Sequence, residues 1–248
     1  MSLLEQLPRP VIFAHRGALS YAPENTLAAF RLAVEHGAPA IELDVKLSAD
    51  GQVVVIHDQT VDRTTNGHGD IRSLALAALR ELDAGSYFAP QFTGEKIPLL
   101  SEVFETVGHQ VLVNIELTNY ASTGDQLVEH VVELVTRHGM AERVLFSSFT
   151  PFNLIRMRRL LPETPSGLLA REGRAGALSR SFVCRWITPD IIHPYKDDVT
   201  PAFVARQKRV NRRIHVWTVN EPREIRRLFE LGVDGIFTDD PRLALQLI

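Results

Sequence analysis

Residues 41–47 read IELDVKL, an apolar stretch interrupted at every second position by Glu42, Asp44 and Lys46. Side chains alternate between the two faces of a β-strand, so these three polar residues would share one face and the apolar residues the other. Burying like charges together is costly unless an opposite charge offsets them. The stretch therefore predicts a strand whose polar face either meets solvent or holds a cation.

Similar apolar runs recur along the chain. Most are continuous, which is typical of strands buried on both faces of a parallel sheet. Amphipathic helical patterns lie between them, at 24–35, 125–137 and 151–161, and further helix starts stand at 200–201 and 220–222. The predicted strands are 11–15, 41–47, 53–57, 111–117, 144–149, 166–170, 187–193, 214–219 and 235–238.

This alternation of strands and helices leaves two α/β architectures, an open doubly wound sheet and a closed barrel. A length of 248 residues with eight main strands favours a single (β/α)8 (TIM) barrel over residues 1–248. Residues 59–98 break the alternation, with turn signals at Asn66–Gly67 and Gly94. We interpret them as a small insertion after the second strand unit. We expect it to lie over the mouth of the barrel, the end where the carboxyl ends of the strands meet.

Composition restricts the classes of function. The 27 Lys and Arg residues against 30 Asp and Glu give a net charge of −3, which argues against a nucleic-acid partner. The single cysteine, Cys184, excludes an intrachain disulfide and fits a reducing compartment. The first ten residues, MSLLEQLPRP, do not resemble a signal peptide, and no apolar run is long enough for a transmembrane segment. We therefore expect a cytoplasmic protein, and the oligomeric state leaves no signal in the sequence.

Acidic residues mark the carboxyl ends of the predicted strands, the face that carries the active site in TIM barrels. Glu42 and Asp44 share a strand face, and Glu116 stands in a matching apolar strand. Carboxylate oxygens are the ligands that hard divalent cations prefer. The sequence predicts one divalent cation, Mg²⁺ or Ca²⁺, held by these three residues. The alternative is a solvated strand face without an ion.

Two histidines, His15 and His57, each end a predicted strand. Beside a cation and an anionic substrate, such a pair can act as general acid and general base, although either could instead be a structural, hydrogen-bonded histidine. Arg16 suits phosphate recognition through its forked donors, with a surface ion pair as the alternative. Trp217, on an apolar strand, could belong to the core or line a ligand.

Basic residues gather near the end of one predicted helix: Arg206, Lys208, Arg209, Arg212 and Arg213. Cations at a helix C-terminus interact favourably with the helix dipole. We interpret the cluster as a solvated helix end, with contact to an anionic surface as the alternative.

The chain resembles the glycerophosphodiester phosphodiesterase family in a set of motifs that covers essentially its whole length in order. They are His15-Arg16-Gly17, Pro23-Glu24-Asn25-Thr26, Glu42-Leu43-Asp44-Val45, His57-Asp58, Asp62-Arg63-Thr64-Thr65-Asn66-Gly67, Ile97-Pro98, Asn114-Ile115-Glu116, Val216-Trp217-Thr218-Val219-Asn220 and 232–239. One such motif alone would be weak, whereas the full set at these spacings is specific.

The resemblance implies a TIM barrel with an insertion after the second strand. It also implies metal-dependent hydrolysis of glycerophosphodiesters, such as glycerophosphocholine, to glycerol 3-phosphate and an alcohol. The three carboxylates would hold the cation, and His15 and His57 would be the acid–base pair. Arg16 would bind the phosphate, and Trp217 would line the glycerol side of the pocket. The attacking group would be the substrate's own 2-hydroxyl or water.

One position departs from the family pattern. Members commonly carry a lysine two residues after the third carboxylate, where this chain has Thr118. Lys46 shares the strand face of Glu42 and Asp44 and could supply the missing charge. We therefore expect Thr118 and Lys46 on the substrate side of the site, with an effect on efficiency or head-group choice.

Three other functions remain open. A lysophospholipase D-type phosphodiesterase would need a broad apolar entrance, for which the insertion offers Leu79, Leu82, Tyr87, Phe88 and Phe92. A non-catalytic barrel that binds phosphodiesters would fit the missing lysine, but not the retained histidines and carboxylates. An isomerase or aldolase acting on sugar phosphates is the third. An aldolase needs a lysine at a strand end, where this chain offers only Lys46.

Overall fold

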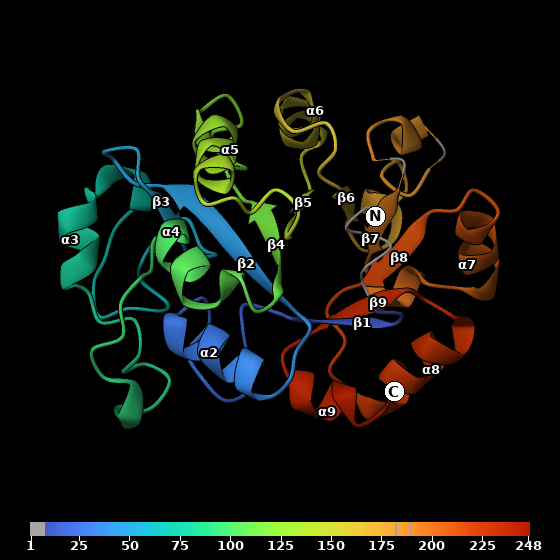
Figure 1. Ribbon diagram of the computed structural model, residues 1–248, viewed down its shortest axis with the longest axis horizontal. Coiled ribbons are helices and arrows are strands. Elements are labelled where there is room, and N and C mark those ends of the chain that lie inside the picture. Colours follow the sequence, from blue (N-terminus) through green and yellow to red (C-terminus); the bar gives the residue numbers. More distant parts are fainter. Residues whose placement is uncertain (1–7, 182, 189) are drawn as a thin grey trace.

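The computed structural model describes residues 8–181, 183–188 and 190–248. Within them, eight parallel strands close into a barrel with helices around its outside (Figure 1). β1 pairs with both β2 and β9, and these two pairings close the sheet, so the predicted TIM barrel is confirmed. In order around the barrel the strands are β1 (Val11–Ala14), β2 (Ala40–Leu47), β4 (Leu112–Leu117), β5 (Val144–Ser148), β6 (Ser166–Ala170), β7 (Ile191–Pro194), β8 (Arg213–Val216) and β9 (Gly235–Thr238).

A further short strand lies outside the barrel. β3 (Val53–Val55) runs antiparallel to β2, with Val55 opposite Val45. It is shorter than the predicted 53–57, although the Ile56 N–H still donates to the Asp44 carbonyl at 2.9 Å. This last bond holds the following residue, His57, close to the carboxyl end of β2.

Two of the helices around the barrel begin directly after a capping threonine. Thr26 and Thr200 accept hydrogen bonds from Ala29 N and Phe203 N, which satisfies a free amide in each first turn. The first helix therefore begins three residues later than the predicted 24–35. No helix of the described residues is long and apolar enough to cross a membrane. The helices around the barrel are α2 (Leu27–Glu35), α4 (Leu100–Val103) with the π-helical turn η3 (Phe104–Gly108), α5 (Leu127–Arg137), α6 (Pro151–Leu160), α7 (Pro201–Lys208), α8 (Pro222–Leu231) and α9 (Pro241–Leu245).

The segment between β6 and β7 departs from strand–helix alternation. It forms two short 3-10 turns, η4 (Gly173–Gly176) and η5 (Val183–Trp186), in place of a full helix. The predicted strand 187–193 was wrong at its start, since β7 begins at Ile191. The N–H groups of Ile187 and Thr188 donate back to the Cys184 carbonyl, so they are not available to a sheet. Residue 189 of that prediction lies outside the described residues.

Residues 59–98 follow β3 and form η1 (Ile71–Ser73), α3 (Leu76–Glu81) and η2 (Pro90–Phe92). They pack a small apolar cluster of their own, in which Leu79 is fully buried. Figure 1 shows α3 at the edge of the molecule, outside β3. Two side chains of this insertion, Arg63 and Tyr87, contact Glu24 next to the mouth.

Two histidines are buried inside the barrel. His193 on β7 and His215 on β8 have ring centroids 5.3 Å apart, and their ring nitrogens have no hydrogen-bond partner among the described residues. Burial, aided by the charge of Arg212, lowers the pKa of His193 to about 3. Burial also holds the pKa of His215 well below its usual value, with the neighbouring His193 as the next cause. Both rings are therefore neutral in the folded protein.

We expect this pair to make the fold sensitive to acid. In the unfolded chain a histidine binds a proton near pH 6.5. The folded pKa values lie below that value, so the stabilisation is present above pH 6.5 and is lost as the pH falls toward the folded pKa. Between pH 7.5 and 5.5 each histidine should cost roughly 1 kcal/mol of the free energy of unfolding.

Urea unfolding at pH 7.5 and 5.5 measures this loss. His193→Phe should lose less stability over the interval than the wild type, because one titrating group is gone. His68→Ala, which removes an exposed histidine, is the matched control. An equal loss in wild type and His193→Phe would contradict the assignment.

Candidate active site

The carboxyl ends of the strands surround a cavity at the mouth of the barrel, with a volume of about 120 Å³. It brings together most of the residues that the sequence singles out, from strands far apart in the chain. It is lined by His15, Arg16, Glu42, His57, Asn114, Glu116, Ser147, Phe149, Leu169, Trp217, Thr218 and Phe237.

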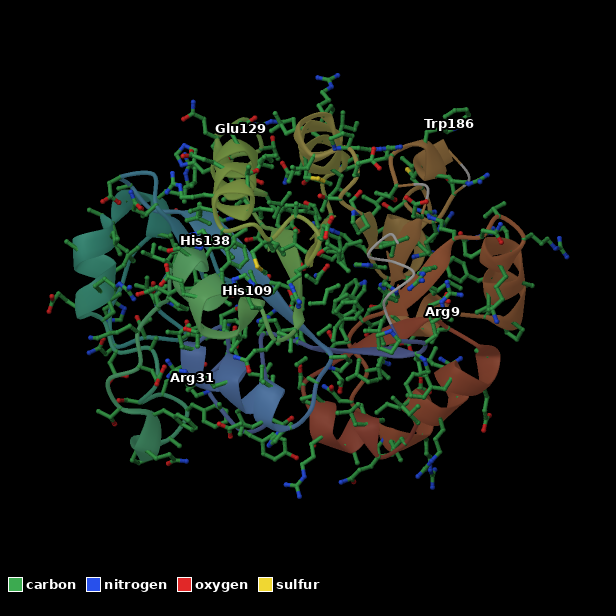
Figure 2. All side chains as sticks on the ribbon, in the orientation of Figure 1. Arg9, Arg31, His109, Glu129, His138 and Trp186 are labelled. Carbon is green, nitrogen blue, oxygen red and sulfur yellow. The ribbon has the colours of Figure 1, made fainter. Side chains whose placement is uncertain are left out.

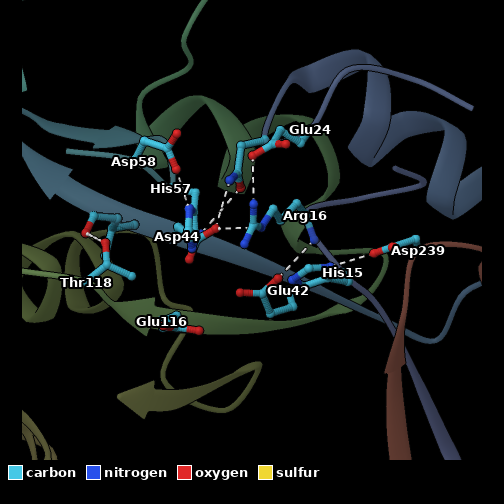
Figure 3. A network of polar contacts seen from close by, with 12 residues as sticks. His15, Arg16, Glu24, Glu42, Asp44, His57, Asp58, Glu116, Thr118 and Asp239 are labelled. Carbon is cyan, nitrogen blue, oxygen red and sulfur yellow. Dashed lines mark hydrogen bonds and ion pairs between the residues drawn. The ribbon is translucent and has the colours of Figure 1, made fainter. Parts of the chain in front are cut away.

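Three carboxylates, those of Glu42, Asp44 and Glu116, meet beside this cavity (Figure 3). The register of β2 and β4 places Asp44 opposite Glu116, and one oxygen of each carboxylate lies within 4.8 Å of the others. Burial, Asp44 and Glu116 raise the pKa of Glu42 well above its usual value. Burial and Asp44 raise the pKa of Glu116 to about 8.

The residues around the cluster therefore do not fully offset the negative charge of its three carboxylates. Arg16 offsets part of it and keeps the pKa of Asp44 below its usual value although burial opposes this. A hard divalent cation with oxygen ligands suits such a trio of buried carboxylates, since it supplies the remaining positive charge. The donor set fits the predicted Mg²⁺ or Ca²⁺.

Arg16 links the carboxylates rather than standing free. Its backbone N–H donates to Glu42 Oε2 at 2.9 Å and its Nη1 to Glu24 Oε1 at 2.8 Å, while Nε lies 3.3 Å from Asp44 Oδ2. The guanidinium therefore contacts the cluster and, like Glu42 and Glu116, lines the cavity. This position allows contact with an anionic substrate at the mouth, although two of its nitrogens already face carboxylates.

The backbone at this point has an unusual conformation. Arg16 and Gly17 both have left-handed φ angles, +53° and +88°, at the turn where the Arg16 N–H donates to Glu42. A Cβ added at Gly17 would lie 2.6 Å from Ala29 Cβ and 2.7 Å from the Ala29 carbonyl carbon.

We expect Gly17→Ala to lower the free energy of unfolding by about 3 kcal/mol, through both the φ angle and the collision with α2. Gly139→Ala is the control, because Gly139 shares the positive φ (+64°) but has open space around a new Cβ. Urea unfolding of the two variants should differ by about 2 kcal/mol. Similar losses in both variants would show that the packing against Ala29 is not tight.

Each candidate histidine is held by a carboxylate. His15 Nδ1 lies 2.6 Å from Asp239 Oδ1, and His57 Nδ1 lies 2.6 Å from Asp58 Oδ1 (Figure 3). The pKa values of Asp239 and Asp58 are both held below the usual value. Arg63 is the largest cause for Asp58, while for Asp239 burial acts in the opposite direction and is outweighed by His15 together with Asn220 and Arg16. An ionised carboxylate only accepts, so Nδ1 carries the hydrogen in both rings. Nε2 is then the nitrogen left for proton transfer.

Several residues of this network were not predicted as functional. Arg63 donates to both oxygens of Glu24 and both oxygens of Asp58, which ties the insertion to Arg16 and His57. Asn25, with a left-handed φ of +56°, donates from its side chain to Asp44 at 2.9 Å. Tyr120 OH donates to Glu116 Oε1 at 2.7 Å. Asn25, Asp58 and Arg63 stand inside the quoted family motifs, and this membership was the available signal for them.

Lys46 and Thr118 lie beside the site but do not line the main cavity. Lys46 Nζ donates to the Thr118 carbonyl at 2.8 Å and to Thr118 Oγ1 at 2.9 Å, and both residues border a smaller cavity under the insertion. Burial lowers the pKa of Lys46, while Asp44 and Glu116 act in the opposite direction. The ammonium group is thus electrostatically coupled to the carboxylate cluster.

Aromatic residues form the other wall. Trp217 packs edge-on against Phe149 with ring centroids 5.3 Å apart, and its Nε1 donates to the His193 carbonyl at 2.9 Å. Trp217 is therefore fixed in the lining.

Among the described lining residues none comes from the insertion, and Leu79 is buried in the insertion's own core. The five apolar residues named for a lysophospholipase D-type entrance therefore do not line this cavity.

The chain is similar over nearly its whole length to known phosphodiesterases. A family model described as the glycerophosphoryl diester phosphodiesterase family matches residues 15–243. A glycerophosphodiester phosphodiesterase of Caldanaerobacter subterraneus subsp. tengcongensis is 38% identical over 241 residues, which make up 97% of this chain and 98% of that protein.

Solved structures agree with this similarity. A phosphodiesterase of Oleispira antarctica, in complex with the product sn-glycerol-3-phosphate, is 30% identical with a TM-score of 0.90 and covers 100% of this chain and 99% of its own. A glycerophosphodiester phosphodiesterase of Agrobacterium tumefaciens str. C58 is 32% identical with a TM-score of 0.82, covering 95% and 99%. This chain belongs to the glycerophosphoryl diester phosphodiesterase family.

Proposed function

We propose that this protein hydrolyses glycerophosphodiesters to glycerol 3-phosphate and an alcohol, in a reaction that depends on one divalent cation and two histidines. The observation that carries the proposal is the meeting, in one cavity, of a buried three-carboxylate cluster and two histidines oriented by carboxylates. The relative from Oleispira antarctica, solved with sn-glycerol-3-phosphate, supports the choice of substrate. A non-catalytic binding barrel would not need this set of proton-transfer groups.

Glu42, Asp44 and Glu116 would hold Mg²⁺ or Ca²⁺ through one carboxylate oxygen each. When bound, the cation would polarise the phosphodiester and offset the charge that builds up in the transition state. The chain's own residues prepare this position. Asn25 and Tyr120 donate hydrogen bonds to Asp44 and Glu116, and these bonds orient the carboxylates before any ion arrives.

His15 and His57 would exchange protons with the reacting groups through Nε2. One histidine removes the proton of the attacking hydroxyl, from the substrate's 2-hydroxyl or from water, and the other protonates the leaving alcohol. Asp239 and Asp58 hold the rings in orientation and stabilise the positive charge each ring gains on accepting a proton. Arg16 would bind a phosphate oxygen, and Trp217 would line the glycerol side.

Lys46 would take the place of the family lysine that Thr118 replaces. Lys46 Nζ donates to the carbonyl and the hydroxyl of Thr118. Its ammonium group therefore lies beside the position from which a lysine side chain at 118 would extend. We expect Lys46→Ala to lower kcat/KM about tenfold or more, because a positive charge that acts electrostatically on the carboxylate cluster is lost. The double variant Lys46→Ala/Thr118→Lys should recover part of it.

Steady-state kinetics on glycerophosphocholine measures both variants, with Lys96→Ala on the insertion as the control. Unchanged catalysis in Lys46→Ala would show that the lysine has only a packing role. No recovery in the double variant, together with a loss in the single one, would assign the effect to local structure rather than to charge.

We further propose that the insertion, residues 59–98, borders the mouth through Arg63 and Tyr87 and so limits the size of the substrate. A cytoplasmic location would fit the free cysteine, Cys184.

A panel of glycerophosphodiesters with choline, ethanolamine and glycerol head groups, run beside lysophosphatidylcholine, tests the substrate class. Turnover of the small diesters without release of choline from the lysophospholipid is expected. The reverse preference would favour a lysophospholipase D.

A further inference from the structure

A second cavity lies outside the barrel, between α7 and the segment that connects β6 with β7. Its volume is about 40 Å³, enough for a few waters or one small tetrahedral ion. Arg180 and Arg185 come from the connecting segment, Arg206 from α7, and Arg212 from the turn before β8. None of these residues lines the catalytic mouth.

Four arginines around one small cavity give an unusual concentration of positive charge. The described lining residues include no aspartate or glutamate. One nearby carboxylate, Asp198, accepts from Arg180 Nη1 at 2.8 Å, and Arg180 also donates to the carbonyls of Arg171 and Gly173. The charge of Arg180 is thus matched by Asp198, and Arg206 contacts neutral groups, the Arg180 carbonyl and the Phe203 ring.

Arg212 shows the effect most clearly. It is only 2% exposed, and its Nε and Nη2 donate to neutral acceptors, the Ile191 carbonyl and Thr188 Oγ1. Burial lowers the pKa of Arg212 to about 10; Arg185 lowers it further, while Cys184 and Asp190 act in the opposite direction. A buried guanidinium that donates to neutral acceptors gains stability from any anion that approaches it.

A hydroxyl completes the lining. Ser181 Oγ is buried beside the arginines and has no hydrogen-bond partner among the described residues. A buried polar group without a partner costs free energy. An oxyanion in the cavity would accept this hydrogen bond along with those of the guanidinium groups.

We propose that this cavity is a binding site for a phosphate-type oxyanion, separate from the catalytic mouth. Forked guanidinium donors match the oxygens of phosphate, and the cavity has room for one such group. The phosphate group could belong to a free phosphate compound or to the head group of an anionic phospholipid. Trp186, which is 80% exposed, and Leu178, which is 68% exposed, lie on the same connecting segment and would favour the lipid (Figure 2).

Equilibrium dialysis of the full-length protein with radiolabelled inorganic phosphate, in EDTA, tests the site. The double variant Arg185→Ala/Arg206→Ala should bind phosphate at least about tenfold more weakly at this site, since each lost guanidinium removes charge-assisted hydrogen bonds. Arg209→Ala is the matched control, because Arg209 follows α7 and is exposed but does not line the cavity. It should bind as the wild type does.

Ser181→Ala provides a second variant that changes no charge and should weaken binding to a smaller extent. Co-sedimentation with phosphatidylcholine vesicles, with and without phosphatidic acid, distinguishes the two sources. Arginine-dependent binding to the acidic vesicles assigns the site to a lipid head group, and phosphate binding without vesicle binding assigns it to a free phosphate compound. Phosphate and vesicle binding that is the same in the wild type and the double variant would overturn the proposal.

Discussion

Replacing His57 with alanine is expected to lower kcat for glycerophosphocholine by about 10²- to 10⁴-fold, the usual contribution of a positioned acid or base. The structure gives the reason: His57 lines the cavity, and Asp58, itself bound by Arg63, fixes the hydrogen on Nδ1. His15→Ala should have an effect of the same order, since Asp239 holds that ring in the same way. The two histidines are expected to act in sequence, one as base and one as acid.

The pH dependence of kcat/KM separates catalysis from structure. The wild type should give a bell-shaped profile, and each single variant should lose one limb of it. His68→Ala is the control, because His68 lies on the neighbouring insertion with its side chain 87% exposed. A profile with one limb that neither variant alters would exclude the two-histidine scheme.

Replacing Glu116 with glutamine is expected to lower activity by about 10³-fold, through loss of one of three cation ligands. The same change should not destabilise the protein without metal. Burial, and after it the charge of Asp44, raises the pKa of Glu116, so an uncharged side chain of the same shape relieves both the cost of burial and the repulsion. Tyr120 can still donate to the amide oxygen.

Thermal unfolding with and without Mg²⁺ or Ca²⁺ measures this contrast. The wild type should gain stability from the cation, because binding to the folded state alone shifts the unfolding equilibrium. Glu116→Gln should gain little, whereas the exposed control Glu105→Gln should behave as the wild type. An equal gain in Glu116→Gln and the wild type would mean that the cation binds elsewhere.

The carboxylate cluster was predictable from sequence because side chains alternate between the two faces of a strand, a pattern that can be read from a short stretch of residues. Glu42 and Asp44 share a face in any strand, and the parallel register of β2 and β4 then fixes Glu116 beside them. The barrel itself followed from the same kind of pattern, repeated in apolar runs along the chain. The shared strand face and the apolar runs are features that neighbouring residues determine, whereas the place of Glu116 beside Asp44 comes from the strand order of the barrel.

The partners of the functional residues were not predictable in this way. Asp239 lies 224 residues from His15, and only closure of the barrel by β1 and β9 brings the two together. Arg63 reaches Glu24 and Asp58 from the insertion, whose packing no periodicity describes. The 3-10 turn η5 ends at Trp186, directly before the predicted strand 187–193. A short apolar run does not distinguish the start of a strand from the turn that precedes β7.

The most direct test of the proposed activity is release of glycerol 3-phosphate from glycerophosphocholine by protein stripped with EDTA, before and after Mg²⁺ or Ca²⁺ is returned. We predict no release in EDTA and full recovery with at least one of the two cations. Release that persists unchanged in EDTA, or no release under any of these conditions, would contradict the proposed metal-dependent hydrolysis.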